Sequence, residues 1–167
     1  MSCLLRPPVP GRRESSIAQG CRHILVSRCL LAAVLAALGS NAWSACSFNA
    51  QGLSFGNYDP FGRTNLDGAG NIAVTCDLGV AYKISLSSGA GTYAARALTN
   101  GPHPLYYNLY TDASRIVVWG DGNGGTATVG GSGAGTATNV TVYGRIPADQ
   151  NAHVGNYSDN IIVTVTF

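Results

Sequence analysis

The chain has 167 residues, 46% of them hydrophobic and 11% charged, with a formal net charge of +2. At this length it has room for one domain. The positive charge lies in the first part of the chain. From Ala45 onward five basic residues stand against seven aspartates, a net charge of −2, which excludes the basic surface expected of a nucleic-acid-binding protein.

The first 44 residues have the pattern of a signal peptide. Five arginines form a long basic region, an apolar run follows at residues 29–39, and Ala42 and Ser44 offer small residues for cleavage. The apolar run is too short to span a bilayer as a mature helix. We therefore expect residues 1–44 to be removed on export and residues 45–167 to form the mature domain. Because Met1 is the only methionine, a later start at a non-Met codon stays open.

Cys46 and Cys76 are the two cysteines of the expected mature chain. An even number in an exported protein favours one disulfide. Closing a loop of this length should stabilise the fold by about 3–4 kcal/mol on the loop-entropy model. The alternative makes Cys46 the lipidated first residue of a lipoprotein. It is less favoured, since Trp43 stands where a lipobox has Leu and Cys76 would have no partner.

Short alternating or aromatic runs, separated by Gly, Asn, Asp and Pro, indicate β-strands in the mature chain. Seven are expected, at residues 47–58, 71–76, 81–87, 105–111, 115–119, 139–146 and 160–167. This number of strands in about 120 residues, without a sustained helical period, indicates an antiparallel β-sandwich. The residues 99–104 are expected to form a turn. The Gly-rich run 120–139 is expected to be a mobile hairpin or loop with at most a weak strand at 126–129.

The last expected strand runs to the final residue of the sequence. Its apolar residues alternate, so one face is expected to be buried. No charged residue lies on the strand to prevent its edge from pairing with another chain. The alternating residues are Ile161, Val163, Val165 and Phe167. The sequence therefore raises the question of what pairs with this edge.

Two short motifs resemble ligand-binding sites, but the residues around them do not support that assignment. Gly120, Gly122 and Gly125 match a dinucleotide-binding fingerprint, but no helix follows them to hold a pyrophosphate. Asp121 and Asn123 begin like a calcium loop, yet no bidentate Glu follows. A hairpin turn explains these residues better.

The remaining reactive side chains also give no catalytic pattern. Ser132 lies in a low-complexity run rather than on a strand-to-helix turn, and His103 and His153 stand beside turns without metal-ligand spacing. The aspartates at 112, 121, 149 and 159 stand beside turn-forming neighbours. We expect no enzyme, no cofactor and no metal.

The aromatic side chains indicate one alternative function, which is carbohydrate binding. Tyrosines on strands could line a sugar-binding face of a self-sufficient secreted sandwich, although half-burial in a sheet is the commoner cause. The aromatic positions are Tyr58, Tyr106, Tyr107, Tyr110, Trp119, Tyr143 and Tyr157. Asn139 and Asn156 head weak N-x-[ST] sequons, which matter only in a glycosylating host.

Seven motifs in order resemble one known family. They are "FGNYDP" (55–60), "GNIAVTC" (70–76), "YKISLSSG" (82–89), "LYYNLYTD" (105–112), "WGDG" (119–122), "VYGRIPADQ" (142–150) and the terminal "GNYSDNIIVTVTF". With the paired cysteines, they make the mature chain similar to the spore coat protein U domain, the subunit fold of archaic chaperone-usher pili. The matching motif positions include Gly56, Tyr58, Tyr107, Tyr110, Trp119, Gly120, Tyr143, Gly144, Gly155, Tyr157 and Asp159.

The resemblance implies an immunoglobulin-like sandwich that lacks its final strand. A periplasmic chaperone would fill the gap first, and a strand from a neighbouring subunit would replace it during assembly at an usher. The implied groove is lined by Phe48, Leu53, Phe55, Ile161, Val163, Val165 and Phe167. The protein would be a non-enzymatic subunit of a surface fibre or coat, exported through the periplasm to the cell surface or secreted. No contact with nucleic acid is expected, nor with the membrane after cleavage.

Polymerising subunits of this kind carry a donor segment before the first cysteine. Cleavage after Ser44 would leave only Ala45 there. The expectation is therefore a chain that accepts a strand but gives none, as a terminal or tip-like subunit or a singly attached coat protein.

Overall fold

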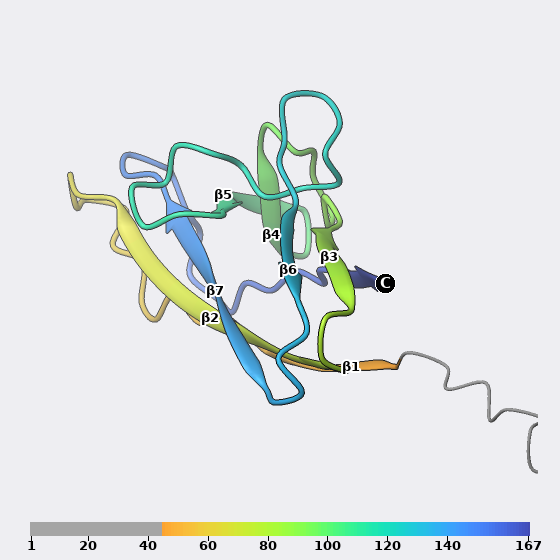
Figure 1. Ribbon diagram of the computed structural model, residues 1–167. Helices are drawn as coiled ribbons and strands as arrows, with labels where there is room; N and C mark the ends of the chain where they lie inside the picture. The colour runs from red at the N-terminus through yellow and green to blue at the C-terminus, as the bar shows by residue number, and fades with distance from the viewer. Residues whose placement is uncertain (1–44) are drawn as a thin grey trace, which may run out of the picture. The chain divides into compact units, whose positions relative to one another are not determined.

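The computed structural model describes residues 45–167, and the expected signal peptide, residues 1–44, lies outside them. The described part contains strands and no helix (Figure 1). The strands are β1 (Cys46–Gln51), β2 (Leu66–Cys76), β3 (Ala81–Leu86), β4 (Arg96–Asn100), β5 (His103–Tyr110), β6 (Val129–Ser132), β7 (Thr138–Ile146) and β8 (Val163–Thr166).

The strands form two sheets. The larger has the order β1-β2-β7-β5-β4, and the smaller has the order β6-β3-β8. Every pair of neighbouring strands is antiparallel. β2 and β7 run side by side, and the C-terminus lies beside β3 (Figure 1). The predicted antiparallel β-sandwich is confirmed.

Alternating side chains explain how the two sheets pack. Along β2 the side chains of Ile72, Val74 and Cys76 are buried, while those between them are more exposed. Along β3, Ile84 and Leu86 are buried in the same way. Successive strand residues point to opposite faces, so these patterns bring one apolar face of each sheet into a shared core.

The structure differs from the expected elements in several places. β2 begins at Leu66 rather than at residue 71, β8 covers only Val163–Thr166 of the expected 160–167, and the turn expected at 99–104 is limited to residues 101–102. The first strand ends at Gln51, and residues 52–58 continue without pairing. Residues 115–119 form isolated bridges only, because Arg115 has a left-handed backbone (φ 59°) and Trp119 turns fully into the core. β4 was not expected, and it forms by pairing with β5 across the turn at residues 101–102.

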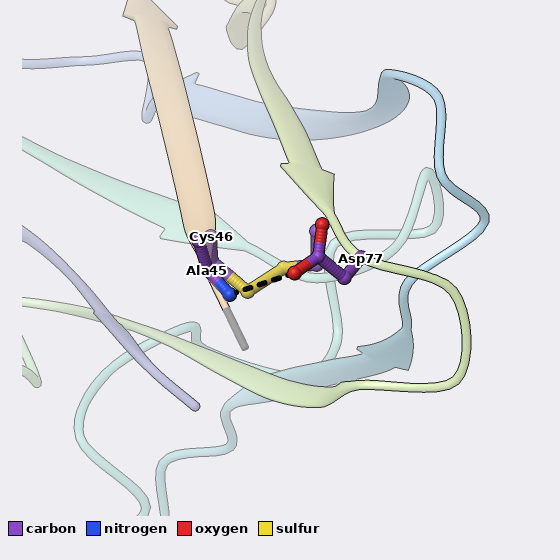
Figure 2. Close-up of a disulfide and its surroundings, with 4 residues drawn as sticks. Ala45, Cys46 and Asp77 are labelled. Atoms are coloured by element: carbon purple, nitrogen blue, oxygen red, sulfur yellow. Dashed lines mark hydrogen bonds between the residues drawn. A yellow bond between two sulfur atoms is a disulfide. The ribbon is translucent and has the colours of Figure 1, made fainter. Parts of the chain in front are cut away.

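A disulfide joins the start of the fold to the end of β2. Cys46 and Cys76 are bonded and are direct partners in the β1–β2 register, as predicted. Next to them the amide of Ala45 donates a hydrogen bond to the carboxylate of Asp77 at 3.0 Å (Figure 2). The amide of Asp77 donates in return to the carbonyl of Ala45 at 3.1 Å. β1 is thus fixed to β2 at this end.

A buried arginine links the two sheets. Arg96 on β4 is fully buried, and its guanidinium donates to the carbonyls of Ser87 and Trp119 and to the side chain of Asn108 on β5. Burial lowers the pKa of this group, but each of its three nitrogens has a hydrogen-bond acceptor. Because Ser87 directly follows β3, the arginine holds the small sheet against the large one.

Candidate functional site: a groove with two unpaired edges

A groove lies against the inner face of the large sheet, and part of it opens between the two sheets. It consists of two adjoining hollows of about 540 and 320 Å³. The two hollows lie next to each other, because four residues line both of them, namely Leu53, Phe55, Leu98 and Asp159.

The floor of the smaller hollow is the apolar core itself. Side chains from both sheets reach it, and they are buried or nearly so. These floor residues are Ile72 on β2, Leu86 on β3, Leu98 on β4, Tyr107 and Leu109 on β5, and Val142 on β7. Sequence reasoning did not assign them to the groove. The period-two pattern marks them as inward-facing but does not show which part of the inner face stays uncovered.

One rim of the groove is the C-terminal strand with the residues just before it. Ile161 and Val163 line the smaller hollow. Within residues 45–167, β8 pairs only with β3, and the bond from the amide of Ser87 to the carbonyl of Ile162 extends that pairing. The other edge of β8 has no strand beside it in the described part of the chain.

The second rim is the segment 52–58, here called the N-terminal rim. Its residues alternate, with Leu53 and Phe55 half-buried and Ser54 exposed, as in a strand. No backbone group of this segment makes a hydrogen bond among the described residues. Two unpaired backbone edges therefore line one apolar hollow.

The structure places the seven implied groove residues in two groups. Leu53, Phe55, Ile161 and Val163 line the groove, whereas Phe48, Val165 and Phe167 line neither hollow. Val165 packs on the core instead. Phe48 lies opposite Val74 in the β1–β2 register and is 47% exposed, and Phe167 is 60% exposed.

The motif tyrosines near the groove use their hydroxyls to hold turns. Tyr58 donates to the carbonyl of Pro147 and accepts from the amide of Gln150. Tyr157 makes the same pair of contacts with the backbone of His153. These tyrosines hold the segment 147–157, of which residues 152–157 line the larger hollow.

Tyr143 lies on the outer face of the large sheet, away from the groove. The guanidinium of Arg115 sits 5.8 Å from the centre of its ring and also pairs with Asp67 at 3.2 Å. Arg145 binds the same carboxylate at 2.7 Å, and this hydrogen bond lowers the pKa of Asp67. The exposed face of this aromatic is therefore already shared with the protein's own arginine.

The other candidate residues lie apart from one another, with one exception. His103 and His153 stack with ring centres 3.7 Å apart. Ser132 is exposed on β6, and Asp121 accepts hydrogen bonds from the backbone and side chain of Asn123 in a closed turn. Among residues 45–167 no three His, Cys, Asp or Glu side chains gather in a way that could hold a metal ion.

Asp159 and Tyr107 form a polar contact at the groove. Tyr107 is 5% exposed, and its hydroxyl donates a hydrogen bond to the carboxylate of Asp159 at 2.7 Å. The same carboxylate accepts from the amides of Ala90 and Asn160. Burial raises the pKa of Tyr107 well above the usual tyrosine range, and the carboxylate raises it further.

We expect this contact to make the fold sensitive to alkali. An unfolded tyrosine loses its proton near pH ~10, so above that pH the unfolded state is favoured by up to about 1.4 kcal/mol per pH unit. The stability from Tyr107 is complete below pH ~10 and is lost as the pH rises toward its folded pKa. Denaturant midpoints of the form in which the protein accumulates, measured from about pH 8 to pH 11, should show this loss in the wild type and in Tyr106→Phe, whose side chain is 49% exposed. Tyr107→Phe should lack it, and an unchanged slope in Tyr107→Phe would contradict the assignment.

The model of the Spore Coat Protein U domain matches residues 31–164. The chain belongs to this family. A curated relative, "Protein U" of Myxococcus xanthus, is 34% identical over 146 residues, covering 77% of this chain and 80% of the relative.

A solved structure confirms the fold of this Spore Coat Protein U domain. It is a chain of the CsuC-CsuE chaperone-tip adhesion subunit pre-assembly complex from the archaic chaperone-usher Csu pili of Acinetobacter baumannii. The TM-score is 0.56 at 22% identity, and the match covers 75% of this chain but 40% of that one. The predicted immunoglobulin-like pilus-subunit fold is thus confirmed.

None of residues 45–167 forms a helix long and apolar enough to cross a membrane.

Proposed function

We propose that this Spore Coat Protein U domain is a non-enzymatic subunit of a chaperone-usher surface fibre or coat, and that its groove accepts a β-strand from another chain. The observation that carries the proposal is the apolar hollow lined by two unpaired backbone edges. An added strand would form backbone hydrogen bonds with both rims, and its alternate side chains would enter the hollow.

The physical need for a partner follows from the same groove. An exposed strand edge beside an apolar floor is a template for aggregation unless another chain covers it. A periplasmic chaperone would cover it first, and a neighbouring subunit would replace the chaperone at an usher. The solved relative with the same fold is itself part of a chaperone complex, which supports this order of partners.

We further propose export of the domain 45–167 to the cell surface after removal of residues 1–44. Cleavage after Ser44 would make Ala45 the first residue, and its contact with Asp77 would hold it against β2. Such a chain has no free segment to donate, which favours a terminal position. Intact-mass measurement of the exported protein checks this, and a mature end well before Ala45 would contradict it.

The first test is expression of the mature chain in an oxidising periplasm, alone and with the chaperone encoded near it. Alone, the chain should be degraded or should aggregate, and with the chaperone it should form a one-to-one complex. Accumulation alone as a monomer that melts cooperatively would contradict strand acceptance. It would favour the alternative, a self-sufficient sandwich that binds carbohydrate through its aromatic side chains.

A further inference from the structure

Three glycines lie beneath the N-terminal rim. Gly68 and Gly70 are on β2 and Gly144 is on β7, and Gly68 and Gly144 are direct register partners. We call them the glycine socket. An added Cβ at Gly144 would lie 2.7 Å from the ring of Phe55, and one at Gly68 would lie 3.0 Å from Leu53. At Gly70 the nearest side-chain atom, the Cβ of Leu53, is 3.2 Å away.

These glycines are not explained by the backbone. None of the three has a positive φ, so other residues could adopt their conformations. Glycine inside a strand weakens it, and often marks a close approach of another part of the chain. Here the close approach is that of Leu53 and Phe55, whose side chains rest where Cβ atoms would otherwise stand.

The socket matters because little else fixes the rim. The segment 52–58 has no backbone hydrogen bonds among the described residues, so its side chains alone set its position. Phe55 meets the ring of Tyr107 edge-on at 5.8 Å, and Tyr58 is held through its hydroxyl. Leu53 and Phe55 both line the groove, so the way they rest on these glycines sets where the N-terminal rim lies.

We infer that the glycine socket determines how well the groove binds a partner strand, by seating the N-terminal rim close enough to the sheet for one extended segment to pair with both edges. This inference rests on the proposed function. The partner it fits is a β-strand of another chain with apolar side chains at alternate positions, which enter the hollow over Ile72, Leu86 and Leu109. A larger residue in the glycine socket would push the N-terminal rim away from the sheet, so that one strand could no longer pair with both edges of the groove.

The test is a graded alanine series, with capture by the co-expressed chaperone as the readout. Gly144→Ala should weaken capture by about tenfold or more, because overpacking at 2.7 Å displaces the rim. Gly70→Ala, with its 3.2 Å contact, should weaken it less, and it keeps the test informative if Gly144→Ala fails to fold. Gly130→Ala on β6 is the matched control, because Gly130 lines neither hollow. Its added Cβ would lie 3.3 Å from the nearest atom, about as close as at Gly70, so capture should stay within about twofold of wild type.

A compensating change separates the socket from a general loss of stability. Phe55→Leu removes the ring atoms nearest Gly144, so it should restore part of the capture lost in Gly144→Ala. If the wild type is captured, and Gly144→Ala, Gly70→Ala and Gly130→Ala are captured equally well, the inference is overturned and the proposed function stands. Absence of capture for the wild type would overturn the proposed function and the inference with it.

Discussion

Replacing Val163 with aspartate is expected to abolish capture of the chain by its chaperone. Val163 lines the smaller hollow on the C-terminal rim, where an added strand would cover it. A carboxylate covered there would have no partner, and burying an unpaired charge costs several kcal/mol, which weakens binding by about a hundredfold or more.

The neighbouring residue supplies the control. Thr164 lies on the same strand with its side chain exposed, so Thr164→Asp adds the same charge to the opposite face. Pull-down of the chaperone complex from the periplasm, at equal transcript levels and with equal signal cleavage, should fail for Val163→Asp and succeed for Thr164→Asp. Equal yields of the two variants would count against the position of the groove.

Loss of the disulfide is expected to have the largest effect on stability. Changing both Cys46 and Cys76 to serine should lower the free energy of unfolding by about 3–4 kcal/mol, since the two cysteines are 30 residues apart in the sequence. For a domain of this size the melting temperature would fall by about 10–15 °C. The measurement compares oxidised wild type, reduced wild type and the double serine variant in the form in which the protein accumulates. Similar melting temperatures for the oxidised and reduced wild type would refute the prediction.

Strands in which apolar and polar side chains alternate regularly are predictable from the sequence, because the apolar positions mark the face that is buried. β2, β3 and β7 are of this kind, with inward residues such as Val74, Ile84 and Val142. β4 was not predictable, because its first residue is a charged one that is fully buried. Arg96 is tolerated there only through acceptors supplied by residues distant in sequence, at Ser87, Asn108 and Trp119.

The groove was only partly predictable for a related reason. An alternating apolar pattern shows which side chains are buried, but it does not show whether the backbone pairs with a neighbouring strand. Leu53 and Phe55 were therefore placed on a strand, although they belong to an unpaired segment that rests on glycines of two other strands. Phe48 and Phe167 share the apolar pattern, but their side chains are exposed and line neither hollow.

The bond between Cys46 and Cys76 also sets how far the chain can be stretched. The 30-residue separation that it bridges would add about 100 Å of extended length if the loop were free. Tension applied between Ala45 and Phe167 would bypass that loop, passing through the sulfur atoms from the first strand into the chain after β2. When pulled in single-molecule experiments, the oxidised chain should therefore extend about 100 Å less than the reduced chain before its backbone is taut.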